Sequence, residues 1–282
     1  ASGGTNSVAT YYYSINNGEF TSSTSNTKTF TGLSAGTTYT IKVYVKDTNG
    51  VDSAVKTSSA ETENIVLLAD YIKGLYTSQG SNGLYYHTSS LANSAADNSY
   101  RYAGANPNNY VCFGSTASTC PSDNLYRIIG VFGSEVKLIK ATSYGSYAWD
   151  SGGSNTWSTS SIRTTLNTTY LNSISSTWQN KIATHTWKVG GMDWSETNTA
   201  KQYYDVEVGS SSSSTTDGMK IGLMYVSDYG FAASNSNWTT ALYYYDSATS
   251  SNWLYLGSTE WTIARNSYNS TRAFVVYYGY VD

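Results

Sequence analysis

The sequence predicts an α+β protein in which a short all-β segment precedes a larger mixed domain. Residues 1–58 alternate apolar and polar side chains with the period of two that strands require. Farther along, a strand hairpin, two short helices and a run of strand-like segments follow one another. Because 282 residues leave room for two ordinary domains, we place them at 1–58 and 59–282.

Composition excludes several classes of protein. Charged residues make up only 12% of the chain, while 28 tyrosines and 24 glycines are present, so the chain has the aromatic groups that disordered chains lack. A net charge of -3 provides no electrostatic footprint for nucleic acid or an anionic membrane. No run of eighteen apolar residues occurs, and we expect no direct membrane insertion.

The N-terminal segment is expected to be a set of short strands. Asn49-Gly50 is a strong two-residue turn between the last two of them. The expected strands are residues 7–15, 27–33, 38–47 and 51–57.

A helix over roughly 62–76 is expected to open the second domain. Its apolar residues recur at spacings of three and four, and Glu61 and Glu63 lie at the favoured acidic end. The apolar set is Ile65, Leu68, Ala69, Ile72 and Leu75.

The body of the second domain is expected to mix hairpins with helices. Residues 125–132 and 135–141 are predicted to pair around Gly133-Ser134, and helices are predicted over 161–174 and 176–187. The remaining strand-like segments are 220–233, 252–257, 260–266 and 273–282.

Two cysteines, Cys112 and Cys120, flank the flexible sequence GSTAST. We expect a disulfide, with free thiols as the first alternative. A zinc site with His87 and His185 is the second alternative, but the cysteine spacing matches no common ligand pattern. A disulfide predicts an oxidising, extracellular location.

The segment from Asn235 onward consists largely of tyrosine, serine, asparagine, tryptophan and glycine. Tyr and Trp offer large contact areas with few rotatable bonds, and Ser, Gly and Asn add adaptable hydrogen bonding, as in antibody combining sites. The composition therefore favours recognition of a ligand.

Catalytic chemistry is not expected, because an active site would show convergent acids, bases or ligands. His185 is expected to pack or to cap a helix. Asn106-Pro107-Asn108 lacks the carboxylate of a calcium-binding triplet and is expected to be a turn, so we expect no metal and no cofactor. No spacing singles out a carboxylate pair among Asp193, Glu196, Asp205, Glu207, Asp228, Asp246 and Glu260.

The stretch FTGLSAGTTYTIKVYVKDTNG, residues 30–50, resembles a fibronectin type III or immunoglobulin-like sandwich. In this resemblance Tyr39 is the corner tyrosine that bonds back to the backbone. The other motif positions are Leu33, Gly36, Ile41 and Val43. The resemblance covers about sixty residues where a sandwich needs about a hundred, which implies an incomplete domain whose first strand lies upstream of Ala1.

A second resemblance covers residues 65–282. The ordered segments NYVCFG, DNLYRIIGVF, VKLIK, YAWD, HTWKVGG, KIGLMYVSDYGFA, NWLYLG, EWTIAR and AFVVYYGYV resemble the C-type-lectin-like fold of the formylglycine-generating-enzyme superfamily. Within it the chain is most similar to retroelement-diversified variable proteins of bacteria and phages. Both cysteines lie in the first half of the chain, so the resemblance does not extend to the oxidase chemistry.

This resemblance implies a rigid scaffold that displays a hypervariable, ligand-binding surface. The implied frame residues are Trp253, Leu254, Trp261, Ile263, Ala273, Phe274, Val276, Gly279 and Val281. The implied ligand-binding residues are Tyr255, Asn266, Ser267, Tyr268, Asn269, Ser270, Arg272, Val275, Tyr277, Tyr278, Tyr280 and Asp282. Adenine-directed variation of asparagine codons cannot produce Lys, Glu, Gln, Met or Trp, and none of these occurs over residues 262–282.

The tyrosines are expected to divide into buried and exposed sets. Strict alternation over 273–282 would place Tyr278 and Tyr280 on the face of Phe274, unless a bulge intervenes at Gly279. The buried set is Tyr126, Tyr225 and Tyr229. The exposed set is Tyr243, Tyr244, Tyr245, Tyr268, Tyr277, Tyr278 and Tyr280.

The sequence thus predicts an extracellular adhesin or receptor, on a cell surface or a phage particle, that binds a protein or glycan. The alternative is a structural subunit of a filament or surface layer that self-associates by strand exchange between incomplete domains. The lectin-like sheet would also need a closing strand after Asp282, from the same or another chain.

Overall fold

The computed structural model describes residues 6–282, which form two compact units that divide after Leu67. The chain is α+β, with mostly antiparallel sheets and several short helices. The boundary lies beyond residue 58 because the last strand of the first unit, β4, continues to Glu61. Within residues 6–282 no helix combines the length and hydropathy needed to cross a bilayer.

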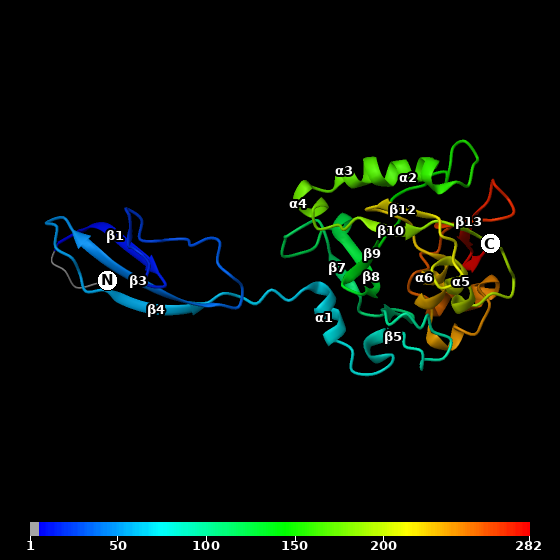
Figure 1. The fold of residues 1–282 in the computed structure, drawn as a ribbon, viewed down its shortest axis with the longest axis horizontal. Helices are drawn as coiled ribbons and strands as arrows, with labels where there is room; N and C mark the ends of the chain where they lie inside the picture. Colours follow the sequence, from blue (N-terminus) through cyan, green and yellow to red (C-terminus); the bar gives the residue numbers. More distant parts are fainter. Residues whose placement is uncertain (1–5) are drawn as a thin grey trace. The chain divides into compact units, whose positions relative to one another are not determined.

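The first unit is one antiparallel sheet in the order β2-β1-β3-β4 (Figure 1). Its strands are β1 (Val8–Ile15), β2 (Thr21–Ser23), β3 (Thr38–Asp47) and β4 (Lys56–Glu61). The Tyr39 hydroxyl accepts a hydrogen bond from the Ser34 amide at 2.8 Å, as a corner tyrosine does. Residues 27–33 are not a strand, so that prediction is wrong: none of these residues is buried, so the alternating pattern is not stabilised by packing.

The helix predicted over 62–76 is shorter than expected. It is α1, Leu68–Gly74, and only Ala69 and Ile72 of its apolar residues are buried. Ile65 is 79% exposed. The apolar spacing extends to Ile65, but this exposed side chain has no packing that could stabilise another helical turn.

The predicted hairpin of the second unit is confirmed. β8 (Leu125–Phe132) and β9 (Glu135–Lys140) pair around a turn at Gly133, whose φ is 63°. β9 occupies one edge of β8, and the other edge is shared by β6 and β7. The remaining strands of this sheet are β5 (Leu84–Tyr86), β6 (Tyr100–Tyr102) and β7 (Tyr110–Cys112). Cys112 and Cys120 form a disulfide with a Cα–Cα distance of 5.7 Å.

Helical residues 161–173 confirm the first of the two predicted helices. They comprise α2 (Ser161–Thr165), a π-helical turn (Leu166–Tyr170) and α3 (Leu171–Ser173). The second predicted helix is reduced to α4 (Ser176–Gln179), because residues 185–188 form β10 (His185–Lys188) and pair with β12 (Thr216–Met219). An additional helix, α5, spans Ala200–Glu207.

Residues 220–233 were predicted as a strand but contain helix α6, Val226–Ala232. All seven residues of α6 are buried, so no amphipathic pattern distinguishes this short helix from a buried strand. Its N-terminus is fixed by carboxylates: Asp228 accepts from the Tyr225 amide, and Glu207 accepts from the Val226 and Ser227 amides.

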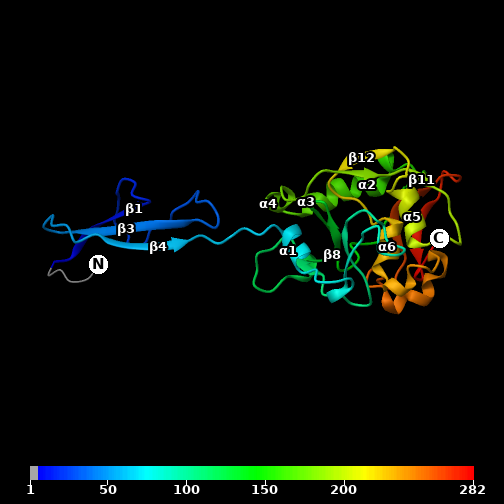
Figure 2. The same ribbon diagram turned by 60° about the horizontal axis from the view of Figure 1, so that its bottom comes forward.

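The C-terminal sheet has the order β11-β13-β14-β15. Figure 2 labels the short β11 close to the C-terminus. β13 (Glu260–Asn266) confirms the prediction for 260–266, and the short β11 (Gly191–Met192) runs parallel to it. The predicted strand 252–257 is absent, since Asn252 makes only an isolated bridge to Ala233. The predicted single strand 273–282 is a hairpin of β14 (Ala273–Tyr277) and β15 (Tyr280–Val281).

This sheet lies between two hydrophobic cores. Phe274, Val276 and Val281 belong to the larger core, whereas Ile263 belongs to the smaller core, with Ala273 packed against it. Successive side chains point to opposite faces of a strand. Val275 and Tyr277 therefore share the face of Ala273, and neither belongs to the smaller core. Toward the turn of the hairpin, this face of β14 is therefore no longer covered by the smaller core.

Candidate functional site

The tight turn of the C-terminal hairpin determines where its tyrosines point. Tyr278 and Gly279 have φ values of 47° and 96°, and both central residues of a type I′ turn require positive φ. Tyr277 pairs directly with Tyr280, so the two rings lie on one face, 5.8 Å apart. The expectation that Tyr278 and Tyr280 share the face of Phe274 is therefore wrong, because the chain reverses there.

Glycine is required at the second turn position. A Cβ at position 279 would lie 2.2 Å from the Thr249 side chain. The residue also has a positive φ, which glycine adopts more readily than other residues. The carbonyl of Gly279 accepts a hydrogen bond from the hydroxyl of Tyr229 at 2.7 Å. Tyr229 is fully buried. The hydrogen bond from the buried Tyr229 therefore fixes the position of the turn.

Six aromatic rings, which we call the aromatic surface, form a continuous series around this hairpin. Tyr243 is central, with its ring centroid 5.6 Å from that of Trp194, 5.6 Å from that of Tyr280 and 5.1 Å from that of Tyr244. Most pairs are edge to face, which is a favoured geometry for aromatic rings. Its members are Trp194, Tyr243, Tyr244, Tyr277, Tyr278 and Tyr280. Trp194, Tyr244, Tyr277 and Tyr278 are 38–69% exposed.

The 3₁₀ segment Leu242–Ser251 supports one side of the aromatic surface and packs against β15. Its three consecutive tyrosines do not all face solvent. Tyr245 is fully buried and donates to the carbonyls of Gly230 and Asn237, so the prediction that it is exposed is wrong. A helix of three residues per turn necessarily directs one of three successive side chains inward.

The hydroxyl group of Tyr280 is a neutral hydrogen-bond donor at physiological pH. Burial, followed by the nearby Asp282, raises the pKa of Tyr280 above its ordinary value. Asp246 contributes in the same direction. Arg265 pairs with Ala273, which lies four residues before Tyr277 on β14. Arg265 is therefore about 13 Å from Tyr277 along the strand direction. The surface therefore combines aromatic faces, hydroxyl groups and carboxylates.

A second exposed segment, the loop 267–272, lies at the opposite end of β13 and β14. The buried Asn155 side chain holds it: Nδ2 donates to the carbonyls of Asn266, Asn269 and Arg272 at 2.7–2.8 Å. The Asn266 Oδ1 accepts from the amides of Tyr268 and Asn269. These bonds give a loop without regular structure a defined conformation.

Replacing Asn155 with alanine is expected to loosen this loop. The three carbonyls would each lose one hydrogen bond, and the Asn266 carbonyl would lose its side-chain donor. We expect the free energy of unfolding to fall by about 1–3 kcal/mol. Trypsin should then cleave faster after Arg265 or Arg272 in the native protein. Asn167 is the matched control, since its Nδ2 donates to the carbonyls of Arg163 and Ile221, away from the loop. Equal cleavage of the Asn155→Ala and Asn167→Ala proteins would contradict the assignment.

The predicted ligand-binding residues fall into three places. None of the twelve is buried. Tyr255 belongs to neither the hairpin nor the loop 267–272 and packs against the larger core. The hairpin group is Val275, Tyr277, Tyr278, Tyr280 and Asp282. The loop group is Asn266, Ser267, Tyr268, Asn269, Ser270 and Arg272.

Sequence reasoning missed Trp194 completely. It follows β11, which pairs with β13 over only two residues, and no local pattern predicts so short a strand. Tyr243 and Tyr244 were expected to be exposed but were not assigned to the site. Contacts between segments distant in the sequence bring Trp194, Tyr243 and Tyr244 to the hairpin. No local sequence pattern predicts such contacts.

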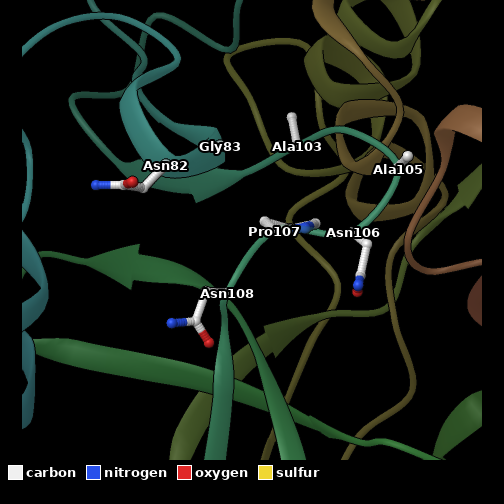
Figure 3. A pocket seen from close by; sticks show the side chains of 7 residues that line it. All are labelled: Asn82, Gly83, Ala103, Ala105, Asn106, Pro107 and Asn108. Carbon is white, nitrogen blue, oxygen red and sulfur yellow. The ribbon is translucent and has the colours of Figure 1, made fainter.

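A separate hollow of about 400 Å³ lies on the second unit. Figure 3 shows its lining, which comes from the turn at Asn82-Gly83 and from the loop 103–108. The lining residues include Asn106, Pro107 and Asn108, but no carboxylate. Asn106 Oδ1 instead accepts a hydrogen bond from Arg127 at 3.3 Å. The hollow has amide groups and little charge.

The two histidines lie in different environments. His185 Nδ1 contacts Glu135 at 2.7 Å near the surface, whereas His87 is fully buried against Phe231 and Trp238. With both cysteines in the disulfide, the zinc alternative loses two of its ligands. Over residues 6–282 no cluster of three or more His, Cys, Asp or Glu side chains is arranged to hold a metal.

His87 is expected to make stability depend on pH. Burial, assisted by Arg101 and opposed by Asp97, lowers its pKa to about 3. The unfolded chain takes up a proton below its ordinary pKa of 6.5, but the folded protein does not, so stability is complete above pH 6.5 and falls toward pH 3. The loss is at most about 1.4 kcal/mol per pH unit. Urea unfolding at several pH values should show a smaller slope for His87→Phe; equal slopes would contradict this.

Comparisons with protein-family models, with curated proteins and with solved structures found no match to this chain. The fold and the aromatic surface are therefore the basis for assigning a function.

Proposed function

We propose that this protein is an extracellular ligand-binding protein of the adhesin or receptor type, and that the aromatic surface is its combining site. The observation that carries the proposal is the continuous series of six partly exposed rings around one tight turn. Isolated exposed aromatics are common on soluble proteins, but contiguous apolar patches mark interaction sites.

Rigidity supports the same proposal. Tyr229 and Thr249 fix the turn, and the buried partners Val276 and Val281 fix the hairpin beneath the exposed Tyr277–Tyr280 pair. A surface that is ordered before binding loses less conformational entropy when a ligand arrives. Tyr and Trp add to this advantage because they have only two side-chain torsions each.

The ligand class that fits is a protein or a glycan. Ring faces stack on sugars or on apolar side chains, and the hydroxyl groups supply hydrogen bonds to either. We also propose that the second unit is a C-type-lectin-like domain of the retroelement-diversified type. The support is its burial pattern: seven of the nine implied frame residues are buried, and none of the twelve implied display residues is.

The experiment is a binding screen of the full chain on arrays of glycans and of secreted and cell-surface proteins. The wild-type protein is compared with the Tyr277→Ala/Tyr280→Ala variant. Targets bound by the wild type and lost by the variant would support the proposal and would separate glycan from protein ligands. If every bound target also binds the variant equally well, the aromatic surface is not the combining site.

A second function, as a subunit of a filament or surface layer, is favoured by the N-terminal sheet. All six residues of the outer strand β4 are exposed, so its free edge can accept a strand from another copy. Electron microscopy of the purified protein distinguishes the two functions, because strand exchange produces filaments and a receptor remains dispersed.

A further inference from the structure

A largely enclosed amine and a buried carboxyl group face each other in the second unit. Lys137 lies on β9 and Asp228 lies in the first turn of α6, 91 residues later. The Lys137 Nζ is 2.5 Å from the Asp228 Oδ2. The side chain of Asp228 is 1% exposed and that of Lys137 is 16% exposed. Two reactive groups are therefore held together away from bulk water.

Aromatic rings surround the amine. The Nζ of Lys137 lies 4.1 Å from the centroid of the Tyr225 ring and 4.9 Å from that of Trp187. Burial lowers the pKa of Lys137, opposed by the attraction of Asp228. A lowered pKa increases the fraction of neutral amine, which is the nucleophilic form of lysine.

Asp228 is fixed in position by other groups. Its Oδ2 accepts from the Tyr225 amide at 2.9 Å, and its Oδ1 faces a guanidinium nitrogen of Arg101 at 3.4 Å. Arg101 also pairs with Asp97 at 2.7 Å, so its charge is already balanced without Asp228. Lys137 and Asp228 thus form a second pair that is neutral in total.

A third acidic group lies beside this pair. Glu207 is buried and accepts hydrogen bonds from the amides of Val226 and Ser227 and from the Ser227 hydroxyl. Burial raises the pKa of Glu207 to about 7. Through these hydrogen bonds Glu207 fixes the N-terminus of the helix that carries Asp228.

We propose that Lys137 and Asp228 condense to form an intramolecular isopeptide bond between β9 and α6. Two observations carry the proposal: the direct contact of amine and carboxyl group, and the low exposure of both side chains, with two aromatic rings packed on the amine. Keeping two charges in a dry interior is costly, and the product amide is neutral. The bond would be a covalent modification that joins distant parts of the second unit.

The reaction is balanced without an added reagent. A proton passes from the Lys137 ammonium to the Asp228 carboxylate across their contact, giving an amine and a carboxylic acid. The nitrogen lone pair attacks Cγ, the C–N bond forms, and negative charge develops on Oδ1, which faces Arg101. The C–Oδ2 bond then breaks, and Oδ2 leaves as water with protons from the acid and from nitrogen. No atom is oxidised or reduced.

Mass spectrometry of the full chain tests the proposal. Folded protein is denatured, and its intact mass is compared with the sequence mass less the two hydrogens of the disulfide. We expect the wild type to be lighter by one water, and tandem spectra to show a branched peptide that joins Lys137 to Asp228. Arginine cannot form this amide under these conditions, so Lys137→Arg should have the unmodified mass.

Lys140→Arg is the matched control, because Lys140 lies on the same strand and donates to the Asp123 carbonyl instead. It should lose water as the wild type does. The proposal is overturned if folded wild-type protein has the unmodified mass, if the water loss persists in Lys137→Arg, or if the spectra assign the loss to other residues.

Discussion

Replacing Tyr277 and Tyr280 together with alanine is expected to abolish binding of ligands captured by the wild-type protein. The two rings lie side by side on the outer face of the hairpin, and Tyr280 connects them to Tyr243. Removal of both separates Tyr278 from Tyr243 and interrupts the continuous aromatic surface. A single central tyrosine typically contributes about thirtyfold or more to affinity, so the double variant should lose most measurable binding.

The fold itself should tolerate this change. Tyr277 is 39% exposed, and neither ring belongs to a core. Tyr71→Ala is the matched control, because Tyr71 is 58% exposed on α1 and lies outside the aromatic surface. Binding is measured by surface plasmon resonance and folding by tryptophan fluorescence. Retained affinity in the double variant, or an equal loss in Tyr71→Ala, would refute the assigned site.

Replacing Arg127 with methionine is expected to lower the free energy of unfolding of the second unit by about 3 kcal/mol or more. The guanidinium is buried and lies between two rings, 4.5 Å from the centroids of both Tyr110 and Trp253. Its nitrogens donate to Asn109, to the carbonyl of Trp253 and to the loop at Asn106. Methionine fills part of the volume but leaves the buried acceptors at Asn109 and Trp253 without this donor.

Arg127→Lys refines the expected result. Lysine keeps the charge, but its ammonium cannot reach the separated acceptors and stack on both rings, so we expect a loss of about 2 kcal/mol. Guanidinium chloride unfolding followed by tryptophan fluorescence reports on the second unit alone, since all eight tryptophans lie in it. A change below about 0.5 kcal/mol in Arg127→Met would show that the acceptors find other partners.

Segments with strong local signals were predicted well. The hairpin of β8 and β9 has alternating side chains and a glycine turn, and the corner hydrogen bond of Tyr39 follows a short motif. The helix near Ile162 follows from its apolar spacing. In each case neighbouring residues carry the information, so the physical cause is contained in one stretch of chain.

Predictions failed where distant residues decide the structure. Helix α6 is buried on every side, so its sequence is as compatible with a strand as with a helix. Its N-terminus is capped by Glu207, which lies outside the helix in the sequence. The strand predicted over 273–282 reverses at Tyr278-Gly279, in a turn that depends on support from Tyr229 and Thr249. Alternation alone could not show that reversal.

By itself, the sequence determined an aromatic, weakly charged α+β chain with a tyrosine-rich C-terminus, because composition and local periodicity are properties of the chain alone. Only the tertiary structure decided which tyrosines face solvent, and it brought Trp194 and Tyr243 to the hairpin. The physical reason is that burial depends on which segments pack together, and packing joins residues that are far apart in the sequence.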